Sequence, residues 1–283
     1  MFHKGSLLTI VLVIVGFIVT TGCSSSAPVL DHPTTNSTLW MQHSAEYKAI
    51  TTSIYKTAGA NLALALEDSY WSAYTGKTEE NYRTKPPAVI LDVDETVLNN
   101  AAFQARMIKQ NSKFNIAAWN QWVMEAKADA VAGALTFTKW ADQKDVNIYY
   151  ITNREAKVEE GTRKNLKKLG FPLSEDDDHI LSKNERKNWT SAKTARRDYV
   201  AQKHRILMVF GDDLNDFVSA KGISQQERAS LVQKHQEKWN KKWYILPNPV
   251  YGYWESALYN FENSLSNSQI DRKKLEQLES QKE

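Results

Sequence analysis

The chain is poor in the features that mark several large classes of protein. A single cysteine, Cys23, stands among its 283 residues, so no disulfide can form within the chain. Neither sign of charge is in excess, because 36 Lys and Arg residues stand against 33 Asp and Glu residues and leave a net charge of +3. The basic residues are scattered along the sequence, and we therefore expect no nucleic-acid polymer as a partner.

The apolar stretch near the N-terminus is short for a membrane span. It covers residues 7–19, follows the basic Lys4 and precedes the small residue Gly22, which is the layout of a secretory signal. We expect residues 1–22 to be a signal peptide and residues 23–38, which begin with three serines after Cys23, to be a flexible tether.

The position of Cys23 resembles that of the cysteine in a bacterial lipobox, where the thiol is lipidated after the signal is cleaved. Thr20 departs from this pattern, which usually has leucine or another aliphatic residue there. Ordinary secretion with an unmodified cysteine is the alternative. The resemblance implies a lipid anchor at Cys23. Because Ser24 is not an aspartate-type signal for inner-membrane retention, we expect the protein in the outer membrane of a Gram-negative bacterium.

Apolar patterns and turn residues predict helices that alternate with strands. Strands are expected at residues 88–91, 146–151, 205–210 and 243–246, and helices at residues 39–73, 99–127, 155–169 and 190–202. Such alternation is typical of an α/β fold with a parallel sheet and right-handed crossovers. We expect one domain over residues 39–265 and a charged helix or tail over residues 266–283.

The strand at residues 88–91 runs into Asp92 and Asp94, two carboxylates spaced two residues apart. Burial of ionised acids is costly unless a metal, hydrogen bonds or a substrate compensates for the lost water. In an open parallel sheet, ligands bind at the carboxyl ends of the strands. The Asp-x-Asp pair therefore indicates chemistry rather than packing.

Polar residues elsewhere suit the transfer of a phosphoryl group, which needs a nucleophile, a proton donor and cations. Asp92 can act as the nucleophile, and Thr152 at the next strand end can donate a hydrogen bond to the phosphoryl oxygens. Lys193 can offset the repulsion between phosphate and carboxylates, and Lys187 is a rival for this role. Asp92 and the turn that begins at Asp212 offer the oxygen ligands that Mg²⁺ prefers.

The order of these residues resembles the four motifs of the haloacid dehalogenase (HAD) superfamily of phosphatases. The chain is still more similar to the bacterial class C, nonspecific acid phosphatases, including the outer-membrane lipoprotein e family. Two signatures carry this resemblance: residues 89–100 read VILDVDETVLNN and residues 211–217 read GDDLNDF. Phe103 stands where the family usually has tyrosine, and Asp213 stands where it has Asn or His, which adds a negative charge near the metal.

The resemblance implies a HAD-like Rossmannoid core, a parallel sheet flanked by helices, with a smaller mainly helical domain or cap. It further implies that Asp92 is phosphorylated, and that Asp94 protonates the leaving group and then activates the attacking water. Thr152, Asn153 and Lys193 are implied to bind the phosphoryl oxygens.

The resemblance also implies one Mg²⁺ per chain as cofactor. Its ligands would be the Asp92 side chain, the Asp94 backbone carbonyl and Asp212, with Asp213 and Asp216 in the ligand set or next to it.

Family members of the lipoprotein type hydrolyse nucleoside 5′-monophosphates and nicotinamide mononucleotide, with the base held between aromatic rings. Stacking on an aromatic face tolerates any base. Trp119, Tyr251 and Trp254 are candidates for this clamp, and each could equally be a core aromatic residue. Small phosphomonoesters are the expected partners, and the oligomeric state is left open, with a dimer as one possibility.

Two other functions compete with hydrolysis. A phosphotransferase would pass the same aspartyl phosphate to an alcohol, and a non-catalytic lipoprotein would use the scaffold for ligand binding. The presence of all the residues that phosphoryl transfer requires argues against the non-catalytic lipoprotein. The six histidines form no metal-like pair, and no Arg-His-Gly signature is present, so histidine-based acid phosphatase chemistry is not indicated.

Overall fold

The computed structural model describes residues 1–2, 32–77, 79–262 and 264–279. The expected signal peptide, the lipidation residue Cys23 and most of the expected tether lie outside these residues. From His32 onward the chain belongs to one structural unit. Within the described part, none of the helices has both the length and the hydropathy that a transmembrane span requires.

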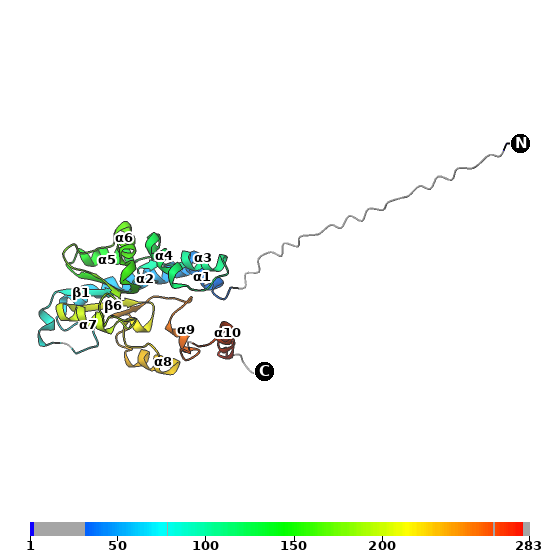
Figure 1. Cartoon of the computed structure of the whole chain (residues 1–283). Coiled ribbons are helices and arrows are strands. Elements are labelled where there is room, and N and C mark those ends of the chain that lie inside the picture. The colour runs from blue at the N-terminus through cyan, green and yellow to red at the C-terminus, as the bar shows by residue number, and fades with distance from the viewer. Residues whose placement is uncertain (3–31, 78, 263, 280–283) are drawn as a thin grey trace. The chain divides into compact units, whose positions relative to one another are not determined.

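The central sheet has five strands, all parallel to their neighbours, in the order β5-β4-β1-β6-β7 (Figure 1). The strands are β1 (Pro87–Leu91), β4 (Asn147–Glu155), β5 (Ile180–Lys183), β6 (Arg205–Gly211) and β7 (Trp243–Ile245). The chain first builds outward from β1 through β4 to β5 and then returns to the other side of β1 through β6. This reversal of direction places a crevice at the carboxyl end of β1, where α/β proteins bind ligands.

Both faces of the sheet are buried, which explains why β1 reads as a continuous apolar run. Val89 and Leu91 belong to one core cluster, and Ala88 and Ile90 belong to the other. Helices α2 (Ala45–Glu67) and α5 (Ala134–Asp142) cover the first face, and α7 (Thr194–Lys203) covers the second (Figure 1). The expected parallel α/β sheet is therefore confirmed.

Two of the predicted helices are interrupted. The segment 39–73 holds two helices, α1 (Thr35–His43) and α2, and its last part is not helical because α2 ends at Glu67. The break falls at Ser44, which is extended and whose side chain accepts a hydrogen bond from the Tyr47 N–H at 3.0 Å. This Ser cap starts a new helix. The segment 99–127 also divides, into α3 (Ala101–Lys109) and α4 (Ile116–Glu125), and Asn115 caps α4 in the same way.

The remaining elements connect or flank this core. The two-stranded ribbon is formed by β2 (Leu98–Asn99) and β3 (Asp129–Ala130), and the other helices are α6 (Glu159–Leu169), α8 (Gln225–Lys234), α9 (Tyr253–Ala257) and α10 (Asn267–Glu276). Gly170 ends α6 in the left-handed conformation at φ 83°. The helix expected from residue 155 starts later, because β4 continues to Glu155.

Candidate functional site

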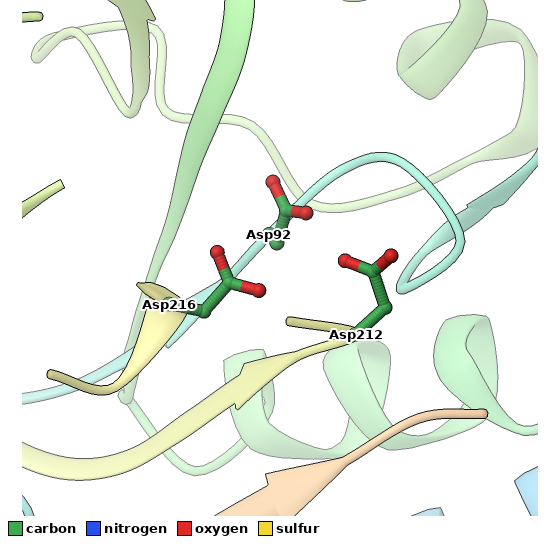
Figure 2. Close-up of side chains that lie close together, drawn as sticks. All are labelled: Asp92, Asp212 and Asp216. Atoms are coloured by element: carbon green, nitrogen blue, oxygen red, sulfur yellow. The ribbon is translucent and has the colours of Figure 1, made fainter. Parts of the chain in front are cut away.

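Three carboxylates converge at the carboxyl ends of β1 and β6 (Figure 2). Asp92 directly follows β1, Asp212 directly follows β6, and Asp216 ends the short 3₁₀ helix Leu214–Asp216. One oxygen from each carboxylate lies within 4.8 Å of one oxygen from each of the others. The three negative charges therefore share a small volume.

The turn after β6 depends on a glycine. A Cβ atom added at Gly211 would lie 2.2 Å from Asp216 Oδ2 and 2.3 Å from Asp216 Cβ, so Asp216 would have to move. Without a side chain at Gly211 the chain folds back, and the Asp213 N–H donates a hydrogen bond to Asp216 Oδ2 at 3.0 Å. This turn aims the Asp216 carboxylate at the strand ends.

Lys193 lies between two of the carboxylates. Its Nζ contacts Asp92 Oδ1 and donates to Asp216 Oδ1 at 2.6 Å. Burial raises the pKa of Asp92 to about 7, against the lowering effect of Lys193. Burial by itself would lower the pKa of Lys193, but Asp216 and Asp92 together raise it above the ordinary value. Lys193 therefore stays charged and neutralises one of the three carboxylates.

Asp212 has no cationic side chain against it within the described part of the chain. Its Oδ2 accepts a hydrogen bond from Asn248 Nδ2 at 2.7 Å. Burial, followed by the charges of Asp92 and Asp216, raises the pKa of Asp212 well above its ordinary value. A site with three carboxylates and one lysine lacks positive charge, and its hard oxygen donors fit a divalent cation such as Mg²⁺.

The candidate metal ligands differ in part from those expected. Asp92 and Asp212 lie in the cluster as expected, and Asp216, which the sequence left between two roles, joins them as the third member. The Asp94 side chain lies outside the cluster and forms an ion pair with Arg154. A role for the Asp94 backbone carbonyl stays a prediction.

The residues expected to bind the phosphoryl group fall into two sets. Lys193 and Asn153 line the cavity above the carboxylates. Thr152 is fully buried and is not among the lining residues, and its Oγ1 accepts a hydrogen bond from the Arg154 N–H at 3.0 Å. Lys187 is exposed, so the geometry favours Lys193 for the lysine role.

A cavity of about 440 Å³ opens over the carboxylates. Trp119 and Tyr251 line it as expected, but Trp254 does not and is 40 % exposed. The sequence did not identify two other aromatic rings in the wall, Phe114 and Tyr253. The cavity is large enough for a leaving group of nucleoside size, and four of the residues that line it are aromatic.

Asp213 has its own counterion. Its Oδ2 lies 3.4 Å from Arg228 Nη2 and accepts a hydrogen bond from the Tyr253 N–H at 2.9 Å. Burial, followed by the charge of Asp216, raises the pKa of Asp213. The extra negative charge at this position is therefore tied to α8 and α9 rather than directed at the three-carboxylate cluster.

Sequence reasoning missed residues that hold the others in place. Arg154 and Asn100 bind the Asp94 carboxylate, and Asn248 binds Asp212. Each stands inside or next to a segment that the sequence singled out: Asn100 closes the first signature, Arg154 follows Thr152 and Asn153, and Asn248 follows β7. Their positions next to strand ends are the sequence feature by which they could have been identified.

Comparison with known proteins places these features in a family. Residues 27–254 match the family model described as HAD superfamily, subfamily IIIB (acid phosphatase). The chain is 35 % identical to the class C acid phosphatase from Bacillus anthracis, with a TM-score of 0.76 over 87 % of this chain and 97 % of that chain. A class C acid phosphatase structure from Bacillus anthracis with tungstate bound is 34 % identical, with a TM-score of 0.77 and the same coverage.

Proposed function

The chain belongs to the acid phosphatases of HAD subfamily IIIB, enzymes of the phosphomonoesterase class, and from this we propose a specific activity for it. It is a Mg²⁺-dependent phosphatase that hydrolyses small phosphomonoesters, nucleoside 5′-monophosphates and nicotinamide mononucleotide among them, through an aspartyl phosphate on Asp92. The observation that carries the proposal is the position of Asp92, which lies against Lys193 at the floor of an aromatic-walled cavity.

The chemistry proceeds in two steps. An Asp92 carboxylate oxygen attacks phosphorus, the bond from phosphorus to the ester oxygen breaks, and the leaving oxygen takes a proton from the Asp94 carboxyl group. In the second step, the Asp94 carboxylate takes a proton from a water molecule as that water attacks phosphorus. The bond between phosphorus and Asp92 then breaks, and inorganic phosphate leaves.

The charges of the site suit these two chemical steps. Lys193 and Asn153 line the cavity beside Asp92, where they can bind the phosphoryl oxygens. Asp92, Asp212 and Asp216 would hold Mg²⁺. When bound, the ion would reduce the repulsion between the negative phosphoryl oxygens and these carboxylates. The neighbour of 34 % identity was solved with tungstate, a tetrahedral oxyanion like phosphate, which supports an oxyanion site in this family.

The cavity wall supports nucleotide substrates. Trp119, Phe114, Tyr251 and Tyr253 line it, and stacking against aromatic faces contributes about 1–3 kcal/mol per base regardless of its identity. Such a wall suits an enzyme that accepts several nucleotides.

A phosphate-release assay tests the activity. The purified protein, with Mg²⁺, should release phosphate from AMP, nicotinamide mononucleotide and p-nitrophenyl phosphate, and Asp92→Asn should abolish the release. The matched control is Asp176→Asn, at an exposed aspartate far from the site in the loop after α6, which should retain full activity. Absence of release by the unaltered protein from all three compounds would refute the proposal. Added nucleoside would distinguish transfer from hydrolysis by its phosphorylated product.

The lipid anchor at Cys23 and the outer-membrane location complete the proposal. Their support is the sequence pattern around Cys23 alone. Expression of the full chain and of Cys23→Ser, followed by membrane fractionation and detergent phase partition, tests both. A Cys23→Ser protein that stays with the membrane fraction would exclude the thiol as the anchor point.

A further inference from the structure

Arg154 and Asp94 form a partly buried ion pair beside the three-carboxylate cluster. Arg154 lies near the end of β4, and its side chain is 1 % exposed. Its Nη2 donates to Asp94 Oδ1 at 2.8 Å, and its Nε donates to the same oxygen at 3.0 Å. Asn100 Nδ2 adds a third hydrogen bond to Oδ1 at 2.9 Å.

The two oxygens of the Asp94 carboxylate are therefore not equivalent. Oδ1 accepts three hydrogen bonds of ordinary length, whereas Oδ2 has one contact within the described residues, a longer one of 3.3 Å to Arg154 Nε. A carboxylate oxygen has about two lone-pair sites, so Oδ1 has no room for a proton. The proton of a neutral Asp94 belongs on Oδ2.

The donors that hold Oδ1 are themselves fixed. Arg154 Nη1 donates to Thr162 Oγ1 at 3.1 Å, and its guanidinium lies over the Trp119 ring at 5.5 Å from the centroid. Asn100 is fully buried, and its Oδ1 accepts a hydrogen bond from Trp122 Nε1 at 2.9 Å. Neither donor can turn without breaking a buried hydrogen bond, so the Asp94 carboxylate has one orientation.

We propose that Arg154, assisted by Asn100, is a positioning residue that fixes Asp94 so that Oδ2 delivers the proton to the leaving oxygen. The inference rests on the proposed function, in which Asp94 is the acid. As the bond from phosphorus to the ester oxygen breaks, the proton moves from Oδ2 to that oxygen, and the new carboxylate charge develops beside the guanidinium. Arg154 stabilises this charge where it forms, which is the condition for a contribution to the rate.

The alternative is that Arg154 serves only the fold, because removal of one partner of such an ion pair leaves the other charge uncompensated. The two roles differ in their dependence on the leaving group. A nitrophenolate leaves readily without a proton, whereas an alkoxide needs one. Loss of proton delivery therefore lowers kcat/KM selectively for poor leaving groups, while loss of folded protein lowers it equally for all substrates.

The experiment measures kcat/KM for p-nitrophenyl phosphate, phenyl phosphate and glycerol phosphate with the unaltered protein and Arg154→Met. General acid catalysis contributes about 100- to 10,000-fold, so we expect Arg154→Met to lose about 10- to 100-fold more activity on glycerol phosphate than on p-nitrophenyl phosphate. The ratio of the two values does not depend on the folded fraction, which keeps the test valid for an unstable variant. Arg154→Lys keeps the positive charge but loses the planar guanidinium. Its ratio of the two kcat/KM values should lie between those of the unaltered protein and Arg154→Met.

Two further variants show whether a negative result concerns Arg154 or the acid role of Asp94. Arg163→Met, which removes an arginine of α6 paired with Glu159 and Asp178, should leave the ratio unchanged. Asp94→Asn should change the ratio at least as much as Arg154→Met. If Asp94→Asn changes the ratio and Arg154→Met does not, the positioning role is overturned. If Asp94→Asn loses activity equally on all three substrates, the acid role of Asp94 falls, and the inference falls with it.

Discussion

Tyr251 donates a hydrogen bond from its hydroxyl to Glu95 Oε2, across 156 positions of sequence. Glu95 is fully buried, and its backbone is in the left-handed region at φ 54°. Burial, followed by the charge of Asp94, raises its pKa to about 7, while Tyr251 and Asn100 act in the opposite direction. One residue of the cavity wall is thus joined to the loop that carries both aspartates of the Asp-x-Asp pair.

Replacement of Tyr251 by Phe should destabilise the protein by about 1–3 kcal/mol, because it leaves a buried carboxyl group short of a donor. Urea unfolding followed by tryptophan fluorescence measures this. Tyr70→Phe, at a ring that is 68 % exposed, should change the free energy of unfolding little. Equal stability of the two variants would show that the hydrogen bond contributes nothing to the fold.

Replacement of Gly211 by Ala should weaken both the fold and the metal site, because the new Cβ meets Asp216 at 2.2 Å. Overpacking of this kind costs about 1–3 kcal/mol, and the displaced Asp216 should raise the Mg²⁺ concentration needed for half-maximal activity. The matched control is Gly59→Ala in α2, where a Cβ meets no atom within 4 Å. Since alanine is the better helix former, Gly59→Ala should stabilise by about 0.5–1 kcal/mol. A wild-type Mg²⁺ dependence in Gly211→Ala would contradict the account of this turn.

Two of the three acids in the second signature, Asp213 and Asp216, should differ in their effect on metal binding. Asp216→Asn removes one of the three clustered carboxylates and should weaken Mg²⁺ binding by about 10-fold or more, because even changes to residues that only support the ligands cost about 10- to 100-fold. Asp213→Asn alters a residue paired with Arg228 and should have a much smaller effect. Titration calorimetry of the chelator-treated proteins measures the affinity directly, and the reverse order of effects would assign the ligand role to Asp213.

Trp119→Ala should raise KM for AMP by about 10-fold, the equivalent of 1.4 kcal/mol of lost stacking, because Trp119 lines the cavity. Trp254→Ala should leave KM unchanged, because Trp254 is 40 % exposed and does not line the cavity. Steady-state kinetics on AMP and on the smaller glycerol phosphate distinguishes stacking from a general loss, since stacking affects only AMP. If KM for AMP changed more in Trp254→Ala than in Trp119→Ala, the base would bind outside this cavity.

The stability of the protein should decrease in acid through His204. Burial lowers the pKa of His204 to about 4, and His179 and Lys203 add to the effect. A histidine in the unfolded chain has a pKa of about 6.5, so between about pH 6.5 and 4 the unfolded state binds more protons than the folded state. The contribution of His204 to stability is therefore complete above about pH 6.5 and is lost as the pH falls through 4.

Urea unfolding at several pH values between 7 and 4 measures this dependence. His204→Gln should make the free energy of unfolding less dependent on pH in this range, and His43→Gln, at an exposed histidine of α1, should not. An unaltered pH dependence in His204→Gln would assign the acid sensitivity to other groups.

The sequence predicted the parts of the fold that local patterns encode. The apolar runs of β1 and β6 are such patterns, and their alternation with predicted helices indicated the parallel sheet. The break at Ser44 depends on one side-chain hydrogen bond and is invisible to periodicity. The short strand β5, in a segment with few apolar residues, forms because β4 offers a free edge.

The sequence singled out Asp92, Lys193 and Asp212 by residue type, and the fold brings these three side chains together. The site was not predictable where a residue acts by holding another. Arg154 and Asp94 are 60 positions apart, and only the folded chain brings them together. The same holds for the aromatic residues of the cavity. Trp119 and Trp254 were both candidates for the base clamp, and only the folded structure shows that Trp119 lines the cavity and Trp254 does not.

The two-sided burial of β1 has a consequence for variation in this protein. Because successive side chains of a strand point to opposite faces, deletion of one residue from β1 would exchange the layers that receive Ala88 and Val89 and shift Asp92 out of its place. The deletion would thus disturb both hydrophobic cores and the three-carboxylate cluster at once. Length changes should be tolerated in the loops of this chain and excluded from β1.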